Sequence, residues 1–424
     1  MAEIKPFKGI LYNEKKVDIA KVVTPPYDII SQSMQNRFYH ADPHNIIRLI
    51  LGKEEKSDTS RNNRYTRSAL FLERWLRGRI FVKDTKPSIY IYTQEYLYRR
   101  RKRTRIGFIA LMKIEDPKES GILPHEYTLD KPKADRFNLI VKTKANLSPI
   151  FCLFQDRENR ISGILKRFVK SRDALFAVDA EGVTHKLWRV QGKSMVEEIK
   201  KCMRSKKIFI ADGHHRYEVA LTYRNRMKRS KNYKKNVDYI MMYFSNLSER
   251  GNLTILSTHR VVRNIPGFGR KKIIPALKRY FRVKSIKRIG DLLKYLDKTP
   301  KGKHSFGVHV RGKFYLLALK EKYSADNVES KKTDALKRLN VTILHDLIID
   351  KILGVKNSES SIKYIRNEKD ALALIDRGDY EMAFFLRPTQ VSEMTAVAKK
   401  GELMPQKSTY FYPKLLTGLV INKF

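Results

Sequence analysis

A short polar cluster follows a run of apolar residues near the middle of the chain. The segment KKIFIADGHHRYEVAL, residues 206–221, places Asp212, His214, His215 and Arg216 within five positions. Polar and ionisable side chains this close together are costly to bury unless a ligand or a counter-charge pairs them. We therefore take this segment as the first candidate site.

The pattern predicts a strand over 206–211 and a helix that opens near 215–217. The backbone amides of residues 213–217, Gly213 included, then lie at a helix N-terminus, where they lack helical acceptors and favour a bound phosphate. Arg216 can add a two-pronged contact to phosphate oxygens, and the histidines can donate to the same oxygens or bind a metal. Asp212 can cap the helix, hold Mg²⁺ or accept the proton of a substrate hydroxyl.

A second cluster is LPHEYT at 123–128, which runs on to Lys133, Asp135 and Arg136. We expect a loop here, because prolines occur at two positions in the segment. The adjacent His125 and Glu126 do not match the HExxH helix of zinc peptidases, since the second histidine is missing. Glu126 remains a candidate general base beside a source of cations, and the alternative is a loop with surface ion pairs.

A third cluster, GELMPQKSTYFYPK at 401–414, contains Lys407, Ser408 and Thr409. These three residues resemble the end of a P-loop, but the preceding GxxxxG is absent, which excludes a Walker-type nucleotide site. They can still bind an anion from a turn. We expect this cluster and the second one to converge with the first on one small-ligand pocket.

Net charge is the unusual bulk property of the chain. Lysine and arginine total 88 against 44 acidic residues, a formal charge of +44 with a pI near 10.1. Such a charge attracts polyanions, so weak and sequence-blind nucleic-acid binding is expected. The basic residues are spread along the whole chain and match no helix-turn-helix, zinc-finger or RNA-binding motif. We interpret the local peak RRRKR at 99–103 as a solvated turn.

Length and composition favour a folded protein away from membranes. The 424 residues are 42% apolar, and no apolar run is long enough to span a bilayer. The start of the chain has no signal-peptide pattern, so we expect a cytoplasmic location. Cys152 and Cys202 lack CxxC spacing, which argues against a structural zinc site or a disulfide framework.

Several segments have clear helix or strand patterns that must position these clusters. Helices are predicted at 63–78, 342–353 and 391–401, strands at 237–246, 253–262 and 380–388, and hairpins at 88–115 and 307–319. The hairpins indicate partly antiparallel sheets, so the fold class is α/β (α+β) with mixed sheets. We expect an N-terminal part, 1–200, and a C-terminal part, 201–424, or a single intertwined domain.

Together these motifs resemble the family known as domain of unknown function 1015. The resemblance runs over nearly the whole chain, through KPFKGILY, VVTPPYDII, HNIIRLIL, LPHEYTLDKPKADR, NLSPIF, ADGHHRYEVAL and GELMPQKSTYFYPKLLTGLVI. Asp28 and Arg48, in the second and third of these motifs, join Lys133, Asp135 and Arg136 as supporting residues.

The resemblance implies a core similar to the ParB/sulfiredoxin-like superfamily. Sulfiredoxins carry Gly-Cys-His-Arg at this turn, whereas His214 stands here in place of the cysteine, so redox chemistry is not implied. ADP-dependent serine kinases of archaea carry Asp-Gly-His-His-Arg, which the turn here matches. What this implies is nucleotide-phosphate binding by 213–216, with Asp212 near the acceptor hydroxyl or Mg²⁺, and ATP or ADP as the cofactor. In those kinases a catalytic glutamate precedes the motif, and Glu126 is the candidate for it.

These inferences lead to one expected function and two alternatives. The expected function is nucleotide-dependent phosphoryl transfer to or from a small hydroxylated metabolite, with serine or phosphoserine favoured. The alternatives are a ParB-like nucleotide-binding protein associated with nucleic acid, and a metal-dependent hydrolase built on His125, Glu126, His214 and His215. All three need the DGHHR turn. The acceptor, the nucleotide, the direction of reaction and the oligomeric state stay open at this level.

Overall fold

The computed structural model describes residues 2–231, 233–249, 251–269, 272–323, 332–356 and 360–424. The chain divides into two compact units. Unit 1 comprises Met1–Pro124, Thr128–Thr254 and Pro413–Phe424, and unit 2 comprises His125–Tyr127 and Ile255–Tyr412.

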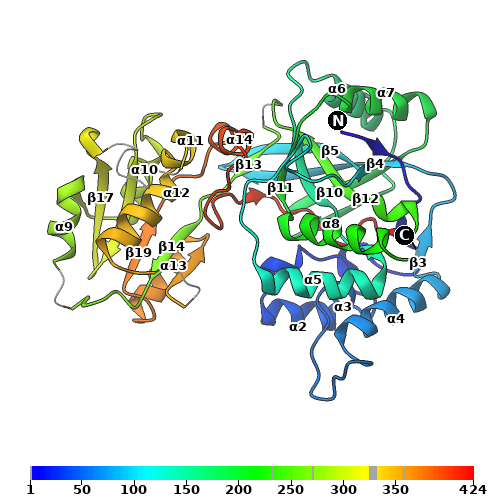
Figure 1. Cartoon of the computed structure of the whole chain (residues 1–424), viewed down its shortest axis with the longest axis horizontal. Coiled ribbons are helices and arrows are strands. Elements are labelled where there is room, and N and C mark those ends of the chain that lie inside the picture. Colours follow the sequence, from blue (N-terminus) through cyan, green and yellow to red (C-terminus); the bar gives the residue numbers. More distant parts are fainter. Residues whose placement is uncertain (1, 232, 250, 270–271, 324–331, 357–359) are drawn as a thin grey trace. The chain divides into compact units, whose positions relative to one another are not determined.

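A nine-stranded mixed sheet forms the centre of unit 1 (Figure 1). Its order is β6 (Ile122–Leu123), β11 (Ile208–Asp212), β8 (Ile150–Phe154), β12 (Tyr239–Asn246), β5 (Arg101–Lys113), β4 (Ile89–Tyr98), β10 (Val183–Val190) and β9 (Phe176–Ala180), with β1 (Ile4–Lys5) also on β5. β11 runs parallel to β6, and β12 runs parallel to β8, while the other pairs are antiparallel. This confirms the predicted α+β class.

Helices cover both faces of this sheet (Figure 1). One face carries α6 (Arg160–Lys170) and α7 (Lys193–Met203), whose isoleucine, valine and methionine side chains join the main apolar core. α8 (His214–Lys228) also contributes Tyr217 and Ala220 to this core, and α5 (Asp130–Thr143) packs against α8. Beyond them lie α1 (Ile19–Val22), the 3₁₀ turn Tyr27–Ile29, α2 (Gln32–Ala41), α3 (Ile47–Ile50) and α4 (Arg64–Arg77).

The predicted helix at 63–78 is α4, and its ends follow from local sequence. Asn63 caps the first turn, and the Thr66 hydroxyl accepts from the Asn63 amide to complete a capping box. Gly78 ends the helix. Small pairs complete unit 1: β2 (Ile10–Tyr12) with β3 (Phe81–Lys83), and β7 (Ala145–Asn146) with β21 (Asn422–Lys423). A 3₁₀ turn spans Lys235–Asp238.

Unit 2 is built on a six-stranded antiparallel sheet. Its order is β15 (Phe281–Ile286), β17 (Lys313–Leu319), β16 (Ser305–Val310), β19 (Met382–Phe385), β14 (His259–Val262) and β18 (Ile362–Ile365). The helices of this unit are α9 (Ile273–Tyr280), α10 (Ile289–Asp297), α11 (Asp334–Lys337), α12 (Asn340–Ile343), the π-helix Leu344–Ile352, α13 (Glu368–Asp376) and α14 (Val391–Lys399), besides the 3₁₀ turn Glu321–Tyr323. Side chains from α10 and α13 form the core on this sheet.

Three sequence expectations differ from the structure. The boundary expected at residue 200 is not where the units divide, because β11 and β12 are inner strands of the nine-stranded sheet and keep residues 201–254 in unit 1. The expected strand at 253–262 is broken into β13 (Thr254–Ile255) and β14. The expected loop at 123–136 ends at Asp130, where α5 begins. Proline is tolerated in the first turn of a helix, because the backbone amides there have no helical acceptor and its missing N–H breaks no hydrogen bond.

The hairpins are confirmed at both predicted places. β4 and β5 are joined at Arg99 and Arg100, and β16 and β17 at Arg311 and Gly312. Strand β20 is Phe411–Tyr412. Among the described residues, no helix is both long and apolar enough to cross a membrane.

Candidate functional site

The turn between β11 and α8 is the centre of the candidate site. β11 ends at Asp212, and Gly213 adopts a left-handed conformation with φ of 97° before the helix begins at His214. A side chain at Gly213 would strain the backbone, and its Cβ atom, 2.8 Å from Nη2 of Arg216, would displace the guanidinium from its present position. The Tyr217 amide donates to the Gly213 carbonyl over 3.0 Å and starts the helical ladder. The amides before it lack an acceptor in the helix, as an anion site requires.

Asp212 is held between two cations. Nη2 of Arg216 donates to its Oδ2 over 3.0 Å, and Nζ of Lys414 contacts its Oδ1. The three side chains are between 10% and 15% exposed, so these contacts are largely shielded from solvent. The turn therefore carries two positive groups and one negative group beside the positive end of the α8 dipole.

Arg216 is fixed by further acceptors. Its Nη1 donates to the Ser148 hydroxyl over 2.8 Å and to the Pro149 carbonyl over 2.7 Å. The guanidinium plane is thus set by the loop before β8 and by Asp212. A ligand at this turn meets an arginine whose orientation is already determined.

The two histidines of the turn have different environments. His214 is buried, and burial lowers its pKa to about 3, so its imidazole is neutral near neutral pH. Nε2 of His215 accepts the amide of Leu129, 2.8 Å away, which places the proton of the neutral ring on Nδ1. This bond ties the start of α8 to the start of α5.

Lys414 is the site residue that sequence reasoning missed. The final segment of the chain returns to unit 1, where the buried Arg105 donates to the Pro413 carbonyl and Nε2 of Gln94 donates to the Lys414 carbonyl over 2.8 Å. These contacts place Lys414 at the turn. It lies within the YFYPKLL motif, but nothing local distinguishes it from the many other lysines.

Two cavities meet at Arg216. One is small and is lined by Asp212, Lys414 and Arg216 together with Ser148, Thr417 and apolar residues. The other is mostly apolar and is lined by leucine, isoleucine and valine side chains together with Tyr27 and Arg136. Ser148, Arg216 and Thr417 line both. The cavity with the charged side chains therefore adjoins the apolar cavity, and small-ligand sites commonly combine a few polar groups with an apolar lining.

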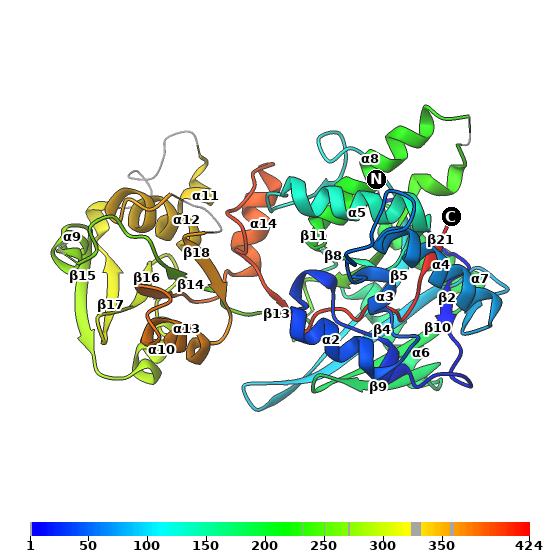
Figure 2. The ribbon, with the colours of Figure 1, turned by 90° about the horizontal axis from the view of Figure 1, so that it is seen from below.

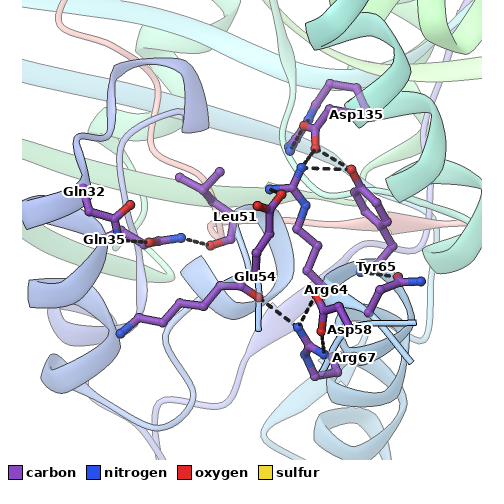
Figure 3. A network of polar contacts seen from close by, with 12 residues as sticks. Gln32, Gln35, Leu51, Glu54, Asp58, Arg64, Tyr65, Arg67 and Asp135 are labelled. Carbon is purple, nitrogen blue, oxygen red and sulfur yellow. Dashed lines mark hydrogen bonds and ion pairs between the residues drawn. The ribbon is translucent and has the colours of Figure 1, made fainter. Parts of the chain in front are cut away.

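The supporting residues of unit 1 form structural contacts around these cavities. Asp135 accepts from Arg64 over 2.7 Å and from the Tyr65 hydroxyl over 2.9 Å (Figure 3). It also accepts from Nε of Arg136 over 2.7 Å. Arg136 also donates to the Ile50 carbonyl and lies 3.9 Å from the centre of the Tyr27 ring.

The other supporting candidates lie in three places. Lys133 forms ion pairs with Asp130 at 3.1 Å and Glu218 at 3.5 Å. Arg48 donates to the Tyr39 carbonyl, and Asp28 is exposed in the 3₁₀ turn. None of these contacts assigns a direct role in ligand binding.

Unit 2 brings the second and third sequence clusters together. Oε1 of Glu126 accepts the Lys407 amide over 2.8 Å, and Nε2 of His125 lies 3.1 Å from the Thr409 hydroxyl. Ser408 is buried and donates to the Pro405 carbonyl over 2.5 Å. The DGHHR turn belongs to unit 1, so convergence of all three clusters stays a prediction.

The metal-dependent hydrolase alternative draws its residues from both units. Within the described ranges, no group of three or more His, Cys, Asp or Glu side chains is placed to hold a metal. The four residues of the hydrolase alternative are divided between the units, with His125 and Glu126 in unit 2 and both histidines of the turn in unit 1.

The fold and the turn together define an α+β protein with a charged strand-to-helix site. The chain belongs to the family described as protein of unknown function DUF1015, whose model matches residues 4–342. No curated protein matches this chain.

Three solved structures are similar over most of their length. A conserved hypothetical protein from Pyrococcus furiosus is 13% identical, with 72% of this chain and 92% of that chain covered and a TM-score of 0.35. A free serine kinase in complex with AMP is 11% identical, with 72% and 86% covered and a TM-score of 0.34. SbnI from Staphylococcus aureus, truncated at its C-terminus, is 11% identical, with 73% and 85% covered and a TM-score of 0.34. Likenesses of this size carry no argument about function.

Proposed function

We propose that this chain is a nucleotide-dependent phosphotransferase that acts on a small hydroxylated metabolite, with serine or phosphoserine favoured by the resemblance of its DGHHR turn to that of the serine kinases. The observation that carries the proposal is the pairing of Asp212 with both Lys414 and Arg216 at the turn that begins α8.

The turn has the features that bind a phosphate group. The first-turn amides of α8 and the helix dipole attract an anion, and Arg216 and Lys414 add charge beside them. Lys414 carries an ammonium with three N–H donors that can be shared between Asp212 and a phosphate oxygen, whereas Arg216 is held by three acceptors. We assign nucleotide-phosphate contacts to Lys414 and the amides, and orientation of the turn to Arg216.

The roles of the carboxylates differ in this proposal. Asp212, paired on both oxygens, orients the two cations and offers an oxygen ligand to Mg²⁺. Glu126, whose Oε1 accepts the Lys407 amide, is the candidate general base for the acceptor hydroxyl. Neutral His214 fills the core beneath the turn and carries no charge to the phosphate.

Mg²⁺ fits this donor set only as a nucleotide-bound ion. One carboxylate with the nucleotide phosphates is a common way for proteins to hold Mg²⁺, and Asp212 is that carboxylate here. When bound, the ion neutralises charge on the phosphate oxygens. Phosphoryl transfer then depends on positioning and on charge stabilisation by the cations of the turn.

The test combines binding and turnover. Isothermal titration calorimetry with ADP and ATP in the presence of Mg²⁺ measures affinity, and phosphorus NMR with serine detects phosphoserine. Lys414→Met should weaken nucleotide binding by roughly 10- to 100-fold, the loss expected for one charged hydrogen bond. Lys8→Met, at an exposed lysine of the same unit, should leave it unchanged.

Asp212→Asn separates binding from transfer. It preserves the shape of the side chain and removes its charge, so nucleotide affinity should stay within a few-fold while transfer is lost. If neither nucleotide binds the wild-type protein, or if Lys414→Met and Lys8→Met behave alike, the proposal is wrong.

A further inference from the structure

The β4–β5 hairpin extends beyond the strands beside it. β10 pairs with β4 only as far as Tyr96, and β12 pairs with β5 only from Gly107 onward. The end of the hairpin, residues 97–102, therefore projects as a two-stranded ribbon, which Figure 2 shows in light blue. We call residues 97–103 the basic tip.

The turn of this ribbon has an unfavourable sequence. Tyr98 pairs with Arg101, so Arg99 and Arg100 form a two-residue turn, with φ of 50° and 63°. Positive φ at both positions is the conformation that asparagine followed by glycine adopts most easily, and a Cβ atom makes it costly.

Two other hairpins in the described part of the chain use the same turn with the expected residue. Glu181 and Gly182 join β9 to β10 with φ of 53° and 76°, and Arg311 and Gly312 join β16 to β17 with φ of 50° and 70°. Both place glycine second, where the basic tip has Arg100. The local fold thus does not require arginine there, and retained strain points to a role for the side chain.

The basic tip concentrates positive charge. Residues 99–103 are five consecutive cations, and apart from partly buried Arg103 they are exposed. Arg100, Arg101 and Lys102 form no ion pair with any described carboxylate. Tyr98 lies between Arg99 and Arg103, whose guanidinium carbons are 5.6 Å and 4.7 Å from its ring centre.

We propose that the basic tip is a nucleic-acid-binding arm that contacts the phosphodiester backbone. A two-stranded ribbon fits the width of a nucleic-acid groove, and arginines stacked on an aromatic ring can also contact bases. A phospholipid surface is the less favoured partner, because the tip offers Leu97 as its one exposed aliphatic side chain. The inference is independent of the proposed function at the DGHHR turn.

The test exploits the fact that arginine is unfavourable in this turn, so that its replacement should weaken binding without lowering stability. Arg99→Asn with Arg100→Gly removes two charges and installs the favoured turn sequence, so the melting temperature should stay equal or rise by about 2 °C. Fluorescence anisotropy with a short duplex DNA and a single-stranded RNA measures binding over a range of salt. For the duplex, the slope of log K against log salt should fall in magnitude by about 1.8. At low salt, the affinity of this double variant for the nucleic acid that the wild-type protein binds, DNA or RNA, should be at least tenfold weaker.

The control removes the same charge elsewhere. Lys298→Gln with Lys301→Gln, at exposed lysines of unit 2, should leave affinity within about twofold if binding is local to the arm. A second variant, Arg101→Gln with Lys102→Gln, leaves the turn intact and should also lose affinity. An equal loss in the control, no loss in either tip variant, or a tip-dependent binding of phosphatidylserine vesicles without nucleic-acid binding would each overturn the proposal.

Discussion

Lys414 forms an ion pair with Asp212, although the two residues are 202 positions apart in the chain. The contact joins the end of β11 to the segment that returns to unit 1 at Pro413. Asp212 therefore has two cationic partners, Arg216 from the same turn and Lys414 from the end of the chain. Substitutions at the residues around this contact can separate its effect on stability from its effect on function.

Arg216 should contribute to stability as well as to binding. Arg216→Gln leaves Asp212, the Ser148 hydroxyl and the Pro149 carbonyl without their donor, so the free energy of unfolding should fall by about 2 kcal/mol. Urea denaturation followed by circular dichroism measures this. Ser148→Ala, which removes one of the three contacts, should cost less than half as much. A variant as stable as the wild type would show that the guanidinium is not the anchor of this turn.

Glu126 should act in transfer and not in nucleotide binding. Glu126→Gln retains an oxygen that accepts the Lys407 amide, so the fold of that turn is kept while the base is lost. The transfer rate should drop by roughly 10²- to 10⁴-fold, the usual contribution of a general base. Nucleotide affinity should be unchanged in calorimetry. Glu321→Gln, at an exposed carboxylate of unit 2, is the matched control, and equal rates in the two variants would exclude Glu126 as the base.

Asp135 should be a stability residue of unit 1. Asp135→Asn weakens contacts to Arg64, Tyr65 and Arg136 at once, and the side chain is only 19% exposed. We expect a loss of about 2 kcal/mol in the free energy of unfolding. The exposed Asp173→Asn should change it by less than about 0.5 kcal/mol. Equal unfolding curves for the two variants would contradict this role.

His214 should make stability depend on pH below neutrality. Burial lowers its pKa to about 3, while the pKa in the unfolded chain is about 6.5. Between these values the unfolded chain binds a proton that the folded chain does not, so stability is full above about pH 6.5 and falls as the pH drops toward 3. Asp212 favours the charged ring, whereas His215, Lys414 and Arg216 oppose it.

The measurement is urea denaturation at a series of pH values. Buried His185 and His345, each with a pKa lowered to about 3, act with the same sign, so a single substitution is needed to isolate His214. His214→Gln should reduce the slope near pH 5 by about 1.4 kcal/mol per pH unit, the value for one proton. An unchanged slope in His214→Gln would show that this ring is not held neutral.

Local structure was well determined by the sequence alone. The helix α4, both hairpins and the strand-to-helix order around DGHHR follow from apolar spacing, capping residues and turn glycines, which act over a few positions. The same local reasoning failed at 123–136, because proline disfavours the interior of a helix but is tolerated in its first turn. It also could not show that Arg100 occupies a left-handed turn.

The tertiary structure alone decided which charges meet. The sequence identified Asp212 and Arg216, but Lys414 is one of 88 basic residues and has no local signal. Its place depends on buried contacts from Gln94 and Arg105, two residues on neighbouring strands, to the backbone of a segment more than 300 positions away. The hydrogen bond from the Lys407 amide to Glu126 is likewise a long-range contact that no local sequence pattern indicates. Sequence periodicity reports which face of an element is buried, whereas long-range contacts depend on how those faces pack together, which no local pattern encodes.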